Sequence, residues 1–325
     1  MGSDVDERRG FLYGATAYLL WGLFPLYWPL LKPAGALEIL AHRMLWSLGF
    51  VAIVVWRTHA WARVRAVLAV REKRWLLGGA AVVITSNWGT YIWGVNSNHV
   101  VETSLGYFIN PLFTILLGVL FLHERLRRTQ WVAVGIASVA IVVLTVGYGR
   151  LPWIALVLAT SFGLYGYFKK RAAAGALESL AIETGYLAIP AFATLIVIDV
   201  RGDLAFGHHG AGKVSLLVLT GVITVIPLLF FGAATRRLPL SMIGLLQYLA
   251  PVLQFFAGVT VDHEKMPTER WVGFALVWVA LLVLTVDGLR LRTQPQRDER
   301  SREESRRRGA ARDEVVVRIS DGPRA

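Results

Sequence analysis

An internal repeat constrains the fold of this chain more than any other feature of its sequence. Residues 105–146 align with residues 245–286 at a constant offset of 140, without a gap, and 14 of the 42 positions are identical. The shared positions include Pro111 and Pro251, Gly118 and Gly258, His123 and His263, Glu124 and Glu264, and Trp131 and Trp271. Self-similarity over this length predicts two similar halves within one fold.

The repeated segments lie within apolar stretches of membrane-spanning length. The chain is 55% hydrophobic and only 17% charged, whereas soluble domains carry about 25% charged residues. About 20 apolar residues cross the hydrocarbon core as a helix, the default structure in lipid. We predict ten spans, at roughly 11–31, 36–56, 75–95, 101–122, 130–147, 152–168, 179–199, 214–233, 240–261 and 270–288. The first is too long for the core of a cleaved signal peptide.

The number of spans in each half determines how the halves are oriented. Residues 11–147 form one repeat and residues 152–288 the other, and each holds five predicted spans. Because five is odd, the second half must enter the membrane upside down relative to the first. The predicted fold is an all-α integral membrane protein with ten transmembrane helices in two inverted five-helix repeats. Many secondary transporters have inverted repeats, with the substrate site near the midplane between them.

The basic residues predict the orientation in the membrane. The formal net charge is +12, and 27 of the 34 Lys and Arg residues fall on one side of the predicted membrane, against six on the other. The positive-inside rule then places both termini, including residues 1–10, in the cytoplasm. Orientation accounts for the basic charge, so we predict no nucleic-acid partner. The tail 289–325 mixes both charge signs and is predicted to be disordered, with arginines that contact anionic lipid headgroups.

Polar residues concentrate in the third, fourth and ninth spans. Thr103, Tyr107, Asn110 and Thr114 follow one helical face. The predicted substrate path adds Asn87, Trp88 and Tyr91 from the third span and Gln247, Tyr248 and Gln254 from the ninth. Such stripes face either a wet cavity or a neighbouring helix to which they hydrogen-bond. We favour the cavity, because Pro111 and Pro251 each leave the carbonyl four residues earlier without its helical amide partner.

Three charged residues within or at the edge of predicted spans are candidate functional groups. Arg43 is the one basic residue inside a span, and its partner at the offset of 140 is Glu183. We predict that the two form an ion pair, which is either a folding latch or a gate that responds to protons or to a charged substrate. Glu102, at the start of the fourth span, is a candidate proton-coupling acid, with helix capping as the alternative.

The motifs of soluble enzymes are incomplete in this chain. The chain has no cysteine, which excludes disulfides and thiolate metal sites. The segments HERLR and HEKMP lack the second histidine of a zinc-protease motif, and GHHGAGKVS lacks the Ser or Thr of a phosphate-binding loop. We therefore predict no metal, no cofactor and no enzymatic activity. A membrane-embedded sensor or enzyme without transport activity remains the alternative to a transporter.

Several segments carry a family resemblance. AHRMLWS at 41–47, NWGTYIWGVNSNHVVETSLGYFINPL at 87–112, FLHERL at 121–126 and TVIPLLFFGAATRRLPLSMIGLLQYLAP at 224–251 resemble the RarD family, a branch of the EamA-type drug/metabolite transporter superfamily. The resemblance extends over about residues 11–288. It implies ten helices, a central cavity and a plasma-membrane location. It also implies a small-molecule substrate, with export of amphipathic metabolites, amino acids or drugs by alternating access as the expected activity.

Overall fold

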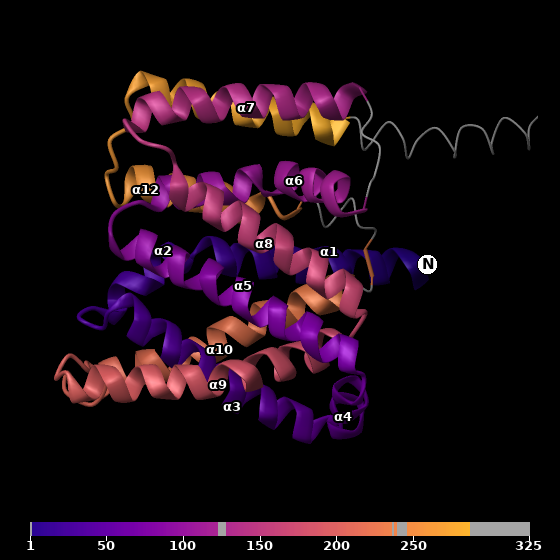
Figure 1. Cartoon of the computed structure of the whole chain (residues 1–325), viewed down its shortest axis with the longest axis vertical. Coiled ribbons are helices and arrows are strands. Elements are labelled where there is room, and N and C mark those ends of the chain that lie inside the picture. Colours follow the sequence, from indigo (N-terminus) through magenta and orange to yellow (C-terminus); the bar gives the residue numbers. More distant parts are fainter. Residues whose placement is uncertain (1, 123–127, 236, 239–245, 287–325) are drawn as a thin grey trace, which may run out of the picture.

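The fold is a bundle of long helices joined by short loops (Figure 1). The computed structural model describes residues 2–122, 128–235, 237–238 and 246–286. The first half contains α1 (Gly2–Gly22), α2 (Phe24–Tyr27), the 3-10 helix η1 (Trp28–Leu31), α3 (Ala36–Arg57), α4 (Trp61–Ala69), α5 (Arg71–Asn96), α6 (Val100–Leu122) and α7 (Arg128–Tyr148). The second contains α8 (Trp153–Ala172), α9 (Ala176–Val200), α10 (Gly210–Thr235), α12 (Leu249–Thr260) and a last helix, Thr268–Val286.

Five of the described helices are long and apolar enough to cross a membrane by length and composition. They are α3, α7, α9, the Gly210–Ala234 part of α10 and the last helix, Thr268–Val286. The α1, α5, α6 and α8 helices contain 20 to 26 residues each, which is about 30 Å or more at 1.5 Å per residue. The part of the chain that the structure describes is thus all-helical, with several helices long enough to cross a membrane.

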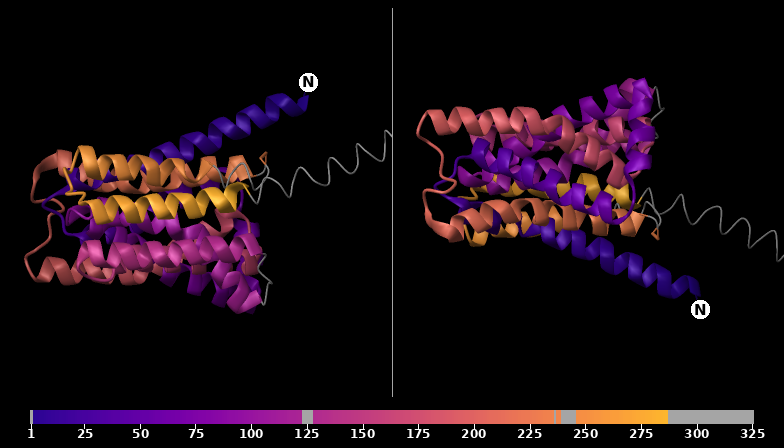
Figure 2. Two further views of the ribbon diagram at one scale, coloured as in Figure 1. Left: turned by 90° about the horizontal axis from the view of Figure 1, so that it is seen from above. Right: turned by 90° about the horizontal axis from the view of Figure 1, so that it is seen from below.

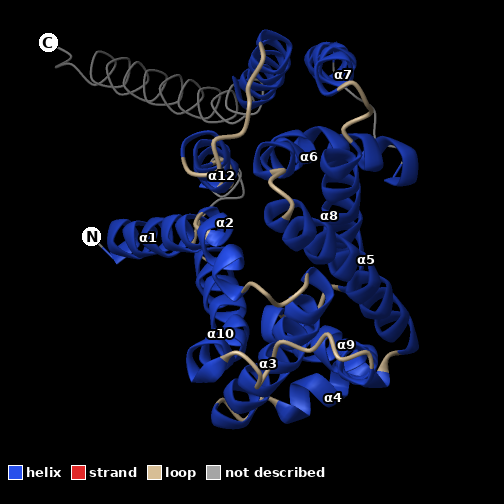
Figure 3. Ribbon diagram, turned by 90° about the vertical axis from the view of Figure 1, so that its left-hand side faces the viewer, coloured by secondary structure: helices blue, strands red, loops and turns tan. Residues whose placement is uncertain are grey.

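The two halves of the chain interleave rather than form separate bodies. α1 packs against α10 and α12, α3 against α9 and α10, and α8 against α5 and α6. Seen along the bundle, α7 and the last helix lie together at one edge (Figure 3). Leu144 on α7 and Phe274 on the last helix belong to the same hydrophobic cluster. The core of the molecule is therefore built from both halves.

Hydrogen bonds fix α3 and α9 as antiparallel neighbours. At the start of α3, Glu38 accepts the backbone N–H groups of Ala205, at 3.0 Å, and Phe206, at 2.9 Å, just beyond the end of α9. Beyond the end of α3, Arg63 contacts Glu178 at the start of α9, with Nε 2.5 Å from Oε1. The amino terminus and α4 lie at one end of the bundle, and the loop 201–209 lies at the other (Figures 1 and 2).

Two predicted spans differ from the observed helices. The first was expected at 11–31, but α1 starts at Gly2 and ends at Gly22, and a turn, α2 and η1 follow. Pro25 and Pro29 explain the break, because each lacks an amide hydrogen and clashes with a continuous helix. In the ninth span α12 begins only at Leu249. Residues 239–245 lie outside the described part of the chain.

The position of α12 corrects one argument made from the sequence. Pro111 lies inside α6, as expected, but Pro251 lies in the first turn of α12. The first amides of a helix have no intrahelical acceptor in any case. The proline therefore does not free the carbonyl of Gln247 by breaking a helix, and Gln247 itself lies in the turn before α12.

Candidate functional site

The polar stripe on α5 and α6 faces α8. Asn87 donates from Nδ2 to the carbonyl of Leu158 and to the hydroxyl of Ser161, both at 3.0 Å. The side-chain oxygen Oδ1 of Asn87 accepts a hydrogen bond from the hydroxyl of Tyr107 at 3.1 Å. Asn110 donates to the carbonyl of Ala159 at 3.1 Å. These contacts are those expected of interhelical hydrogen bonding, so the stripe joins the two halves of the chain.

The other residues of the predicted path lie at several places in the bundle. Tyr91 is buried, and its ring centroid is 5.6 Å from that of Tyr107. Thr103 donates to the carbonyl of Val100 within its own helix. Gln254 is buried and donates to the carbonyl of Trp21 on α1, at 3.1 Å. Gln247 and Tyr248 are half-buried before α12, and the side chain of Thr114 lies outside the described part.

Arg43 lies among aromatic rings. Its side chain is only 3% exposed, and its Nε donates to the hydroxyl of Thr224 on α10 at 2.9 Å. The guanidinium carbon is 4.0 Å from the ring centroid of Trp88, 5.3 Å from that of Trp28 and 5.6 Å from that of Phe24. Aromatic faces attract a cation through their quadrupole. Three segments, α2, η1 and α5, thus enclose one charge carried by α3.

The predicted ion pair between Arg43 and Glu183 is wrong. The carboxylate of Glu183 contacts the ammonium of Lys169 on α8 at 2.8 Å and accepts the hydroxyl of Tyr165 at 3.0 Å. Arg43 lies two turns after the start of α3, and Glu183 lies two turns after the start of α9. Because α3 and α9 are antiparallel, the two residues lie toward opposite ends of this helix pair. Equivalent positions in inverted repeats fall at opposite depths, so these two side chains cannot meet there.

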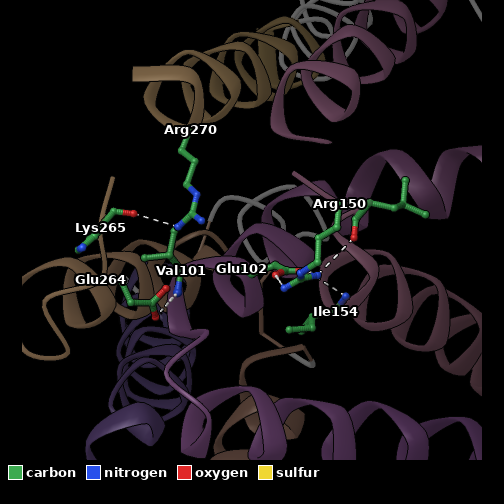
Figure 4. Close-up of polar contacts among 8 residues, drawn as sticks. Val101, Glu102, Arg150, Ile154, Glu264, Lys265 and Arg270 are labelled. Carbon is green, nitrogen blue, oxygen red and sulfur yellow. Dashed lines mark hydrogen bonds and ion pairs between the residues drawn. The ribbon is translucent and has the colours of Figure 1, made fainter. Parts of the chain in front are cut away.

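The loop end of the bundle carries a second group of charges (Figure 4). Glu102 at the start of α6 is buried, and its two oxygens contact Arg150 at 2.7 and 3.3 Å. One of these oxygens also accepts the backbone N–H of Ile154 at 3.1 Å, so Glu102 caps α8. Glu264 accepts the N–H of Val101 at 3.0 Å and caps α6. A role for Glu102 in proton coupling stays a prediction.

Glu264 borders a polar cavity of about 310 Å³ between the loops. The cavity is lined by Asn98, His99, Tyr148, Arg150, Asp262, His263, Glu264, Lys265 and Arg270. Burial raises the pKa of Glu264 to about 7, while the N–H groups of Val101 and Val100 oppose the shift. Nearby Asp262 raises this pKa further and Arg270 lowers it. Glu124, the counterpart of Glu264 in the first repeat, lies outside the described residues.

The prediction from sequence missed the partners of the buried charges. Thr224 and Lys169 contact Arg43 and Glu183, and Arg150 contacts Glu102. Lys169 counted only as one of the basic residues that orient the chain, although its position at the end of a span allows its long stem to reach inward. Phe24 lies within the segment WGLFP at 21–25 and Trp28 follows it, and each is an aromatic residue directly before a proline, which was a usable indication.

Comparison with known proteins identifies the family. A model of the EamA-like transporter family matches residues 8–146. The chain is 56% identical over 290 residues to "Protein RarD" of Streptomyces exfoliatus, which covers 89% of this chain and 92% of that protein. It is 40% identical to "Protein RarD" of Escherichia coli K12, covering 87% and 96%. The chain belongs to the RarD family.

Other relatives of this chain carry general names. The Bacillus subtilis protein "Uncharacterized transporter YojE" is 41% identical over 287 residues, covering 86% of this chain and 95% of that protein. A solved crystal structure aligns with a TM-score of 0.57 and 17% identity, covering 85% of this chain and 97% of the other. That likeness concerns the fold alone. Because the chain belongs to the RarD family, it belongs to a family of membrane transporters.

Proposed function

We propose that the protein is a secondary transporter that moves small amphipathic metabolites, amino acids or drugs across the plasma membrane by alternating access. In this proposal ten transmembrane helices form two inverted five-helix repeats, both termini are cytoplasmic, and the physiological direction is export. The direction rests on the likeness to a superfamily that includes exporters. Transport rather than catalysis is the function of the buried polar residues.

The helix contacts carry this proposal, because they come in pairs related by exchange of the repeats. Under the offset of 140, α1 corresponds to α8, α3 to α9, α5 to α10, and α6 to α12. α1 packs against α10 as α8 packs against α5, and α3 packs against α10 as α9 packs against α5. α6 contacts α8 as α12 contacts α1. This pairing supports two halves that rock against each other around residues at their interface.

Flux measurements test the proposal. The purified protein in proteoliposomes should move a subset of amino acids and aromatic drugs down their gradients, and an imposed pH gradient should change the rate if protons are coupled. Counterflow, in which internal unlabelled solute accelerates uptake of labelled solute, should appear for a carrier. If correctly folded protein moves none of these amino acids and drugs, the proposed transport of these solutes is refuted.

Introduced cysteines test the predicted path. The chain has no native cysteine, so single substitutions at Tyr107, Asn110 and Gln247 give no background. If these positions line a path, small water-soluble thiol reagents should label them, and substrate should protect them. Val142, which is 64% exposed on the outer surface of α7, is the lipid-facing control and should react slowly. Equal, slow reaction at all four positions would show that the stripe is purely interhelical packing.

A further inference from the structure

Three hydrogen-bond donors around Arg43 lack an acceptor among the described residues. They are Nη1 of Arg43, Nε1 of Trp28 and the hydroxyl of Tyr91. Arg43 is 3% exposed, Trp28 0% and Tyr91 2%. Their segments, α3, η1 and α5, contribute to the same hydrophobic cluster. Buried polar groups normally have partners, and here each unpaired group can donate.

The charge of Arg43 is not neutralised by any described acid. The buried glutamates at 38, 102, 178 and 183, and the half-buried Glu264, contact backbone amides or other basic residues, as described above. Thr224 holds Nε but is neutral. The aromatic rings offset part of the cost of burial, whereas an ionised side chain inside a membrane normally faces a counter-charge or a water-filled path.

The surroundings of Arg43 have the chemistry of a binding site for an anion attached to an apolar ring. A guanidinium donates in a planar fork that suits a carboxylate. Trp88 and Tyr91 are three residues apart on α5 and so share one face, and Trp28 faces the same guanidinium from η1. An acidic solute would supply the missing acceptor, and its apolar part would contact Trp88, Trp28 and Phe24.

We propose that Arg43 binds the carboxylate of the transported solute, and that Trp28, Trp88 and Phe24 form the wall against its apolar or aromatic part. This inference rests on the proposed transport function and defines its substrate class as organic carboxylates. Thr224 orients the guanidinium through Nε and leaves Nη1 for the solute. Because these side chains close over Arg43, the two halves must separate before a solute can reach the site.

Binding to the full-length protein in nanodiscs tests the proposal separately from transport. The probes are benzoate, phenylacetate and indole-3-acetate, each compared with its neutral carboxamide by titration calorimetry. At least one acid should bind about tenfold or more tightly than its amide, as expected for a charge-assisted hydrogen bond. Acetate, chloride and phosphate serve as ring-free anions. The proposal is overturned if none of the acids binds more tightly than its amide. It is also overturned if the ring-free anions bind as tightly as the aromatic acids.

Variants assign the preference to Arg43. Arg43→Gln should abolish the acid-over-amide preference, and Arg43→Lys should retain part of it. Arg57→Gln, at the exposed end of the same helix, is the matched control and should bind as wild type. Thr224→Val keeps the charge and should weaken acid binding several-fold, which provides a second test if Arg43→Gln does not fold. Unchanged preference in either Arg43→Gln or Thr224→Val overturns the proposal.

The two proposals fail in different ways. If acids bind through Arg43 but no solute crosses the membrane, the binding site stands and the transport function fails. If neutral or cationic solutes cross and no acid is preferred in binding, transport stands and the assignment of carboxylates fails.

Discussion

Glu264 couples the loop end of the bundle to pH. In the unfolded chain its carboxyl ionises near the ordinary pKa of 4.5, whereas in the folded protein burial keeps the proton until about pH 7. The folded state therefore binds more protons between these values, and the free energy of unfolding falls as pH rises through this window. Above about pH 7 both states are ionised, and this contribution no longer changes.

We expect Glu264→Gln to remove this part of the pH dependence. The amide cannot ionise, but its oxygen can still accept the N–H of Val101. Thermal unfolding from pH 4 to pH 8 should show the wild type losing stability relative to the variant as pH rises. Glu269→Gln, at an exposed position in the same region, should follow the wild type. Parallel curves for wild type and Glu264→Gln would contradict the prediction.

Glu183 should be energetically coupled to Lys169 and independent of Arg43. Glu183→Gln and Lys169→Met should each destabilise the protein, because each leaves the other charge without its partner. A fully buried pair would lose about 3–5 kcal/mol, but Lys169 is 24% exposed, and we expect about 1–3 kcal/mol. The double variant should recover part of the loss.

A second double-mutant cycle separates the observed pair from the pair expected from sequence symmetry. Arg43→Gln combined with Glu183→Gln should give additive losses in unfolding free energy, since the two residues share no contact. Strong coupling in that cycle, with none between Lys169 and Glu183, would contradict the assignment of partners.

At the scale of elements, the contact between α6 and α8 depends on Gly106. A Cβ atom at this position would lie 2.9 Å from the carbonyl oxygen of Ala155 and 2.7 Å from Cβ of Leu158. Backbone atoms cannot move aside as a flexible side chain can. Gly106→Ala should therefore push the helices apart and cost about 1–3 kcal/mol of stability, measured by thermal or steric-trap unfolding in detergent.

Gly135 on α7 provides the matched control. A Cβ atom there would have no neighbour within 4 Å among the described residues. Alanine also favours a helix over glycine, by up to about 1 kcal/mol in water. Gly135→Ala should leave stability unchanged or raise it slightly. Equal destabilisation by the two substitutions would show that the α6–α8 contact does not decide the result at Gly106, because helix propensity favours alanine at both positions.

At the scale of the whole molecule, the asymmetry of basic residues makes a prediction about topology. Reporter fusions or tags at Gly207, in the loop after α9, and at the C-terminus should report opposite sides of the membrane, with the C-terminus cytoplasmic. Gly207 has φ +84°, and a Cβ atom there would have no described neighbour within 4 Å, so an insertion there should disturb little. Reporters on the same side would contradict the ten-span arrangement.

Much of the architecture was readable from the sequence because membrane helices leave a strong local pattern. The predicted span 36–56 matches α3 at Ala36–Arg57, and 130–147 matches α7 at Arg128–Tyr148, since apolar length alone defines a helix in lipid. Pro25 and Pro29 are also local signals of a helix break, although the break after Gly22 was not predicted. The family membership followed from long, specific segments.

The tertiary structure alone decided which polar groups meet. The stripe of Tyr107 and Asn110 was identified from its helical phase, but phase does not say whether the facing surface is a cavity or α8. The offset of 140 paired Arg43 with Glu183 in sequence, yet antiparallel packing of α3 and α9 places them near opposite ends. Partners such as Thr224 are 181 residues away from Arg43. Local sequence therefore determined the helices, and the packing between them determined the charges' environments, because burial and hydrogen-bond partners are properties of the assembled bundle.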